Sequence, residues 1–204
     1  MAKSRRKRKK PAKQPAPAPK KGSKFPTKYL VYGVAVLALA GAGYGFIAGQ
    51  QEASAFEALA KDGRSALSRV KTFPNEGRTH MPDGTQINYA TNPPTSGPHF
   101  NRWVDPGFYP TPKGRSNLVH SLEHGMIVIY YDAPGEEVIG KLKAWTDLFN
   151  GPWSGIVATR KAGLGEKVIL TAWRRMLRLD AFEAQAAAAF IDAYRGRGPE
   201  NPVR

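Results

Sequence analysis

The chain has four histidines, and all of them lie in one short stretch of the sequence. His80, His99, His120 and His124 fall within residues 80–124, and the rest of the 204-residue chain contains none. Neutral imidazole is the commonest metal-binding side chain in proteins. His120 and His124 are four positions apart, so on a helix both would point from one face toward the same ion. The sequence therefore predicts a metal site to which all four histidines contribute.

Two further side chains bear on which metal would suit this site. Glu123 precedes His124, and we expect it to act as a ligand or to orient an imidazole. Met81 follows His80; a thioether favours copper(I), whereas histidines with a carboxylate favour zinc. We therefore expect a transition metal ion, copper or zinc. Its ligands are predicted to come from His80, Met81, His99, His120, Glu123 and His124.

The segment from His120 to His124 also permits an enzymatic interpretation. It reads H-S-L-E-H, and in inverzincin peptidases H-x-x-E-H provides two zinc ligands and a glutamate that activates water. Such a hydrolase needs another carboxylate from a second helix, for which Glu183 and Glu200 are the candidates. A glycine and a strand-like run directly after the motif would shorten its helix. We therefore favour a binding protein over an enzyme, with Glu123 as the catalytic residue if the protein is a hydrolase.

A third interpretation requires no metal. The histidines would then pack separately, and the protein would be a non-catalytic scaffold in a membrane complex. Other chemistry is easier to exclude: the chain has no cysteine, which rules out a thiol mechanism, and it lacks the G-x-S-x-G, P-loop and dinucleotide fingerprints. Ser96 stands in the run PPTSGPH and is expected to be a turn residue.

The elements that must position these residues follow from the apolar pattern. Residues 71–115 are rich in proline and glycine, which predicts a long structured loop of the kind that usually carries function. After it we predict a short helix ending near His124, a buried strand over 126–132, a helix over 136–149 and a final helix up to Gly196, with Asp180 and Glu183 as its capping box. Residues 156–160 and 167–173 are predicted to pair as a hairpin. This order indicates an α+β fold, a small sheet packed by helices.

The N-terminal part explains the charge of the chain. Twelve of the 31 lysines and arginines of the chain lie in residues 1–28, which contain no acidic residue. Most of the net charge of +15 is therefore concentrated in this segment, and we expect no specific binding of nucleic acid. Residues 29–49 are uncharged and long enough to form a single-pass transmembrane helix. The positive-inside rule places the N-terminus in the cytoplasm and the remainder in the periplasm or outside the cell.

This pattern divides the chain into five segments. They are a disordered basic cytoplasmic tail (1–28), the transmembrane helix in the inner membrane (29–49), a juxtamembrane helix (50–70), one extracytoplasmic domain (71–196) and a C-terminal tail (197–204). The tail is expected to attract anionic headgroups. Gly41 and Gly45 form one small-xxx-small match, which suggests a homodimer or a membrane-protein partner.

Two longer motifs resemble a known family. Residues 92–99 read NPPTSGPH and residues 118–125 read LVHSLEHG, followed by the strand-like MIVIYY; together with His80, Pro82 and Gly84 they are similar to a bacterial family known as domain of unknown function 3105. The likeness covers roughly residues 65–195. It implies a basic tail, one membrane helix and a recurrent group of His80, His99, His120, Glu123 and His124, but no activity. Members commonly have Gly-Gly after the histidine where this chain has Gly125 and Met126, so Met126 is not expected to be a ligand.

Overall fold

The computed structural model describes residues 27–204, with side chains described for Tyr32, Val34, Gly45 and residues 47–204. The chain divides into two compact units, residues 1–44 and residues 45–204. Helix α1 (Thr27–Asp62) belongs to both units. The second unit contains the sheets, the remaining helices and all four histidines, and it is described below.

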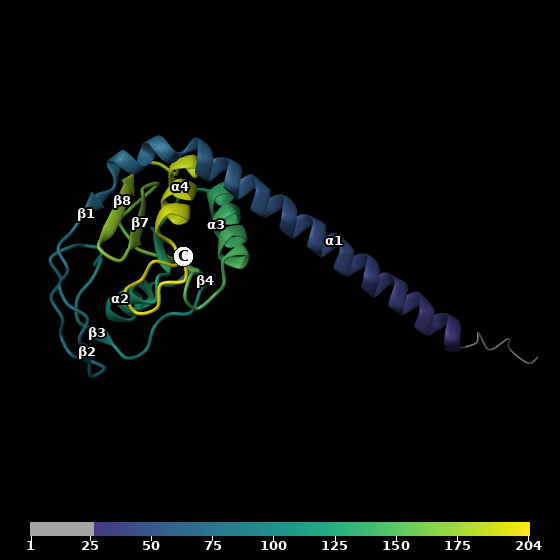
Figure 1. Cartoon of the computed structure of the whole chain (residues 1–204), viewed down its shortest axis with the longest axis horizontal. Coiled ribbons are helices and arrows are strands. Elements are labelled where there is room, and N and C mark those ends of the chain that lie inside the picture. Colours follow the sequence, from purple (N-terminus) through teal and green to yellow (C-terminus); the bar gives the residue numbers. More distant parts are fainter. Residues whose placement is uncertain (1–26) are drawn as a thin grey trace, which may run out of the picture. The chain divides into compact units, whose positions relative to one another are not determined.

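A six-stranded mixed sheet forms the centre of this unit (Figure 1). Its order is β1 (Lys71–Thr72), β8 (Arg175–Leu179), β7 (Val168–Ala172), β5 (Ile127–Tyr131), β6 (Ile156–Arg160) and β4 (Gly107–Tyr109). Strands β4, β5 and β6 run parallel, whereas β7 is antiparallel to β5 and to β8, and β8 is antiparallel to β1. A separate parallel pair is formed by β2 (His80–Met81) and β3 (His99–Phe100).

Helices and loops cover both faces of the sheet. Ile127 and Ile129 of β5 pack with Trp145 of α3 (Glu136–Leu148) and Phe190 of α4 (Ala184–Tyr194), and Phe56 of α1 joins the same core. Successive side chains of a strand point to opposite faces. Val128 and Tyr130 accordingly pack on the other face, with Leu118 and Leu122 of α2 (Arg115–Glu123). Every residue of β5 is therefore buried, as expected for a strand with both faces covered.

The prediction of an α+β domain with helices packed on a sheet is confirmed, and most of the predicted elements are present. Helix α2 ends at Glu123 with His124 as its C-cap, and α3, β5 and β6 lie within one or two residues of their predicted bounds. The long segment before α2 contributes β1, β2, β3 and β4, which are only two or three residues long. Strands this short are too brief to show an alternating pattern.

The predicted hairpin of residues 156–160 and 167–173 is wrong. Strands β6 and β7 do not pair, because β5 lies between them. The glycine-containing turn after β6 passes over the end of β5: Lys161 N donates to Tyr131 O, and Ala133 N donates to Gly165 O. The true hairpin is β7–β8, and its turn contains Arg174 at a φ of 62°. No apolar alternation in RMLRL distinguishes β8, so the sequence did not reveal it.

The start of the last helix also differs from its prediction. Helix α4 begins at Ala184, Glu183 is its N-cap residue, and no side chain caps it. The Glu183 carboxylate instead accepts two hydrogen bonds from Arg69, at 2.9 and 2.6 Å, in the short 3₁₀-helix Arg64–Arg69. Asp180 lies in an exposed bend 3.9 Å from Lys167 Nζ. A bidentate arginine partner outcompetes the local capping box.

None of the helices in the described part of the chain is both long enough and apolar enough to cross a membrane. The predicted basic tail, 1–28, lies almost wholly outside the described residues, as do most side chains of the predicted span, 29–49.

Candidate metal centre

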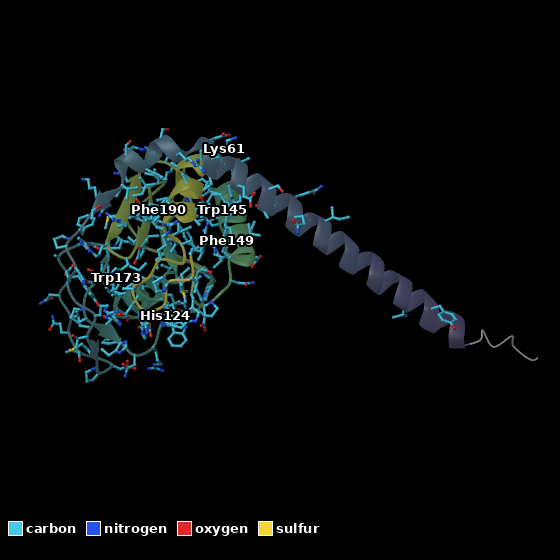
Figure 2. All side chains as sticks on the ribbon, viewed as in Figure 1. Lys61, His124, Trp145, Phe149, Trp173 and Phe190 are labelled. Carbon is cyan, nitrogen blue, oxygen red and sulfur yellow. The ribbon has the colours of Figure 1, made fainter. Side chains whose placement is uncertain are left out.

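Helix α2 presents three polar side chains on the side opposite its core contacts. Leu118 and Leu122 are fully buried against the sheet. Glu123 and His124 lie three and four residues after His120, so both share another face of the helix with it. The rings of His120 and His124 have centroids 4.7 Å apart. All three side chains are at least 95% buried. Figure 2 shows His124 next to α2, apart from the Trp145 and Phe190 side chains of the α3 and α4 core.

The parallel pair β2–β3 brings the other two histidines to this face. His80 and His99 are register partners, and their ring centroids lie 4.8 Å apart. The ring of His120 lies 4.9 Å from that of His80 and 4.8 Å from that of His99. Residues 77–81 and 97–100 are joined by backbone hydrogen bonds, including His99 N to Thr79 O. The predicted gathering of all four histidines is therefore what the structure shows.

Backbone carbonyls fix the tautomers of the two most central histidines. The Nδ1 of His99 lies 2.8 Å from Gly97 O, and the Nδ1 of His120 lies 2.8 Å from Phe100 O. A carbonyl oxygen only accepts hydrogen bonds, so both Nδ1 atoms carry the proton. The Nε2 atom of each neutral ring is then left with its lone pair free. Metal-binding histidines commonly have this arrangement, in which the second nitrogen donates to a carbonyl.

Glu123 lies against the free nitrogen of His99. Its Oε2 is 2.9 Å from His99 Nε2 and 3.8 Å from His80 Nε2. Although the first distance is short, the geometry is not that of a hydrogen bond, and His99 Nε2 is buried without a hydrogen-bond partner among the described residues. An ionised carboxylate and an unprotonated nitrogen are both acceptors, so they repel unless a cation or a proton lies between them. Arg78 Nε lies 3.7 Å from the other carboxylate oxygen.

The pKa values of these groups shift as burial predicts. Burial lowers the pKa of His99 and of His120, although the hydrogen bonds to Gly97 and Phe100 oppose the shift. Burial also raises the pKa of the Glu123 carboxyl, and the nearby Glu200 carboxylate raises it further. Each shift favours the uncharged form of its group. The imidazoles are thereby kept neutral, which is the form that binds metal.

The C-terminal segment 197–204 supplies a further carboxylate. Glu200 Oε2 lies 3.1 Å from His124 Nε2, and Glu200 N donates to Glu123 O at 3.4 Å. The segment passes very close to the end of α2, since a Cβ on Gly198 would overlap Glu123 O and Gly125 N. The His124 ring contacts two indoles, with its centroid 4.2 Å from that of Trp153 and 4.6 Å from that of Trp103. Residues at the far end of the sequence therefore complete the site.

Two overlapping groups of ligands result, and the ligand atoms of each lie within 4.8 Å of one another. The first consists of His80, His99, His120 and Glu123, and the second of His120, His124 and Glu200. Both groups are able to hold a metal ion. Glu200 was predicted only as the distant carboxylate of a hydrolase, and Glu183, the other such candidate, is occupied by Arg69.

Met81, Met126 and Ser96, which the sequence also singled out, do not belong to either group of ligands. Met81 follows His80 in β2, so its side chain points to the other side of the strand. Met126 is fully buried in the core, as predicted. Ser96 Oγ accepts from Glu76 N and donates to Pro74 O, which makes it a structural hydroxyl of its loop.

Comparison with known proteins gives one similarity. Residues 80–204 match the family model described as "Protein of unknown function (DUF3105)". No curated protein and no solved structure matches the chain. The matched range includes all four histidines, Glu123 and Glu200, and it extends the resemblance seen in the motifs to the end of the chain.

Proposed function

Since this chain belongs to the DUF3105 family, for which no activity is described, we propose a function from the site itself. The protein is a membrane-anchored, extracytoplasmic metal-binding protein. It binds copper or zinc through His80, His99 and His120 with Glu123. Three imidazoles and one carboxylate suit zinc and copper(II) better than they suit magnesium or calcium, which prefer oxygen ligands.

One observation carries this proposal: two buried acceptors face each other 2.9 Å apart, His99 Nε2 and Glu123 Oε2. A buried polar atom without a partner destabilises a fold by about 1–3 kcal/mol. A divalent cation between the two atoms removes this repulsion, and His80 and His120 offer it two more nitrogens. The tautomers fixed by Gly97 and Phe100 aim the free lone pairs before any ion arrives.

The same geometry weighs against the two alternatives. In an inverzincin-like hydrolase, His120 and His124 would bind zinc while Glu123 stays free to activate water. Glu123 Oε2 lies instead 2.9 Å from His99 Nε2, a position that suits a metal ligand and not a free base. In a scaffold without metal, the histidines need not meet, yet the rings of His80, His99 and His124 all lie within 4.9 Å of His120.

The membrane part of the proposal rests on the sequence. The uncharged run 29–49 follows a tail with twelve basic residues, and this combination is typical of a single inner-membrane anchor with a cytoplasmic N-terminus. The metal site would then lie in the periplasm or outside the cell. A homodimer or a membrane-protein partner, packed through Gly41 and Gly45, is part of the same proposal.

Metal analysis of the full chain tests this function. The protein, purified without a histidine tag and dialysed against zinc or copper(II), is expected to retain the metal in stoichiometric amount. His80→Ala removes an exposed ligand without opening the core and should lower the affinity about 10-fold or more. Gln86→Ala, an exposed change in the same loop, is the matched control and should bind normally. A chain that retains neither metal at any pH would contradict the proposal.

A further inference from the structure

The site contains more ligands than one ion requires. Its four imidazoles and two carboxylates form two groups that share only His120. Within each group the ligand atoms lie within 4.8 Å of one another, so they need to move inward only slightly to reach the ~3.3–3.6 Å that separates two ligands of a tetrahedral ion with bonds of ~2.0–2.2 Å. His124 and Glu200 belong to the second group alone. A single ion in the first group would leave this pair unused.

His120 is able to serve only one ion at a time. Its Nδ1 donates to Phe100 O, so Nε2 carries its one available lone pair. If Nε2 binds an ion in the second group, the first group keeps His80, His99 and Glu123. Each group then has two imidazoles and one carboxylate, a ligand set that holds transition metals and leaves positions open.

The structure assigns this site two metal ions side by side, one bound by His80, His99 and Glu123 and the other by His120, His124 and Glu200. This inference rests on the proposed metal-binding function and refines it. The His120 ring lies 4.8 Å from that of His99 and 4.7 Å from that of His124, so the two groups adjoin. In two-metal sites the ions are ~3.5–4 Å apart.

Buried and unpaired atoms occur in both groups. His99 Nε2 in the first group and His124 Nδ1 in the second lack hydrogen-bond partners among the described residues. The other nitrogen of His124 faces a carboxylate: Nε2 lies 3.1 Å from Oε2 of the partly exposed Glu200, as His99 Nε2 lies 2.9 Å from Oε2 of the buried Glu123. The two indoles around His124 restrict its ring to this orientation.

Two divalent ions carry more positive charge than the two carboxylates neutralise. The open positions therefore favour an anionic third component, such as a bridging hydroxide or the oxyanion of a small ligand. Arg78 Nε, 3.7 Å from Glu123 Oε1, adds a positive charge beside the first group. The inferred centre is thus suited to holding an oxygen atom between two metals.

Metal stoichiometry of the full chain tests the inference. After dialysis against zinc, the unchanged protein should contain two equivalents and Glu200→Gln one equivalent. Glu200 is exposed, so this substitution should leave the fold intact. Glu166→Gln, which alters an exposed carboxylate in the turn between β6 and β7, is the matched control and should retain two. One equivalent in the unchanged protein would overturn the two-ion inference alone, whereas none would overturn the proposed function as well.

Copper(II) distinguishes an adjacent pair from a second ion bound elsewhere. Two copper(II) ions ~4 Å apart couple magnetically, so the electron paramagnetic resonance spectrum of the doubly loaded chain should show a coupled pair. Glu200→Gln loaded with copper should show the spectrum of an isolated ion. Two isolated ions in the unchanged protein, or a coupled pair in Glu200→Gln, would overturn the inference.

Discussion

At the scale of single residues, the site depends on which atoms are left without partners. Gly97 O and Phe100 O each accept a hydrogen bond from the protonated Nδ1 of a histidine, which leaves the Nε2 atoms of His99 and His120 free. Glu123 is held against one of these nitrogens in a place from which water is largely excluded. The buried cluster of His99, His120 and Glu123 therefore destabilises the fold when no cation is bound, and it is well arranged to bind one.

Substitution of Glu123 separates a ligand from a catalytic base. Glu123→Gln keeps the size of the side chain but removes its charge, so the ion loses a charged ligand. We expect the affinity for zinc to fall about 100-fold. Removal of a residue that only supports a ligand lowers metal affinity about 10- to 100-fold, and the loss of a ligand should reach at least the upper end of that range. Competition with a chromophoric chelator measures the change. A Glu123→Gln protein that binds zinc as tightly as the unchanged chain would indicate instead that Glu123 acts as a base.

The stability of the metal-free protein should depend on pH. The folded-state pKa values of His99 and His120 lie below their usual value because of burial, whereas in the unfolded chain they return to about 6.5. Below pH ~6.5 the unfolded state therefore binds more protons than the folded state, and stability falls with decreasing pH. Above pH ~6.5 the full contribution of the two neutral histidines to stability is present.

Thermal unfolding of the chelator-treated chain between about pH 7.5 and 5.5 measures this effect. The unfolding temperature is expected to decrease as the solution becomes more acidic. The raised pKa of Glu123 acts in the opposite sense, because protonation of that carboxyl favours the folded state, but one carboxyl opposes two histidines. An unfolding temperature that stays level or rises over this range would contradict the prediction.

The sequence predicted which residues form the site better than it predicted how they are arranged. All four histidines and Glu123 were identified, because imidazoles clustered along the chain and the helical spacing of His120, Glu123 and His124 is local information. The pairing of Glu200 with His124 was not foreseen, because it depends on where a distant segment packs. Backbone carbonyls as partners of His99 and His120 have no signature in the side-chain sequence.

At the scale of elements, the site is held by contacts between segments far apart in the chain. The β2–β3 pair aligns His80 with His99, and α2 is fixed by its leucines on the sheet. Ser121 Oγ joins α2 to the segment that precedes it by accepting from Val104 N and donating to Val104 O. Long-range contacts also explain why the hairpin prediction was wrong. A turn signal in the sequence shows where the chain reverses, but it does not show whether another strand lies between the two strands that the turn connects.

Gly97 should matter both to the fold and to the metal. Its φ of 121° is unfavourable for other residues, and a Cβ would lie 3.1 Å from the Tyr89 ring. Gly97→Ala is therefore expected to lower stability by about 1–3 kcal/mol. Because Gly97 O orients His99, the zinc affinity should fall as well. Denaturant unfolding and zinc titration of the same samples measure the two effects.

Gly163→Ala is the matched control for this backbone strain. Gly163 also has a positive φ, 85°, but a Cβ there meets no described atom within 4 Å, and the residue lies in the turn after β6. It should lower stability by about 1–2 kcal/mol and leave the zinc affinity unchanged. Equal loss of zinc affinity in both variants would show that the effect of Gly97→Ala is a general consequence of destabilisation.

Gly198 is expected to hold the C-terminal segment in place. A Cβ there would overlap backbone atoms of Glu123 and Gly125, which cannot move aside as a flexible side chain does. Gly198→Ala should displace Glu200 from His124 and speed amide hydrogen exchange at Gly196 and Glu200. Gly140→Ala, in the middle of α3 with open space around it, is the control and should stabilise the helix by about 0.5–1 kcal/mol. Unchanged exchange in Gly198→Ala would contradict the assignment.

At the scale of the whole molecule, the sheet has a different apolar layer on each face. One layer contains α3, α4 and the last turns of α1, and the other contains α2. The fold class followed from the sequence because long periodic helices and the wholly apolar run of β5 are strong local signals. The order of the strands did not, since it depends on pairings among six strands, two of which, β1 and β4, have only two or three residues.

The proposed anchor makes a prediction about the whole protein in the cell. Residues 1–28 carry twelve basic and no acidic residues, and residues 29–49 are uncharged, so the full chain should remain in the membrane fraction after extraction with alkaline carbonate. Protease added to cells stripped of their outer layers should digest the histidine-containing domain and spare an epitope placed at residue 1. Neutral replacements of Lys20, Lys21, Lys24 and Lys28, the basic residues next to the span, together with those in 5–13 should randomise this orientation, whereas replacement of exposed Lys61 should not. Release by carbonate would contradict the anchor, and digestion of the N-terminal epitope would contradict its direction.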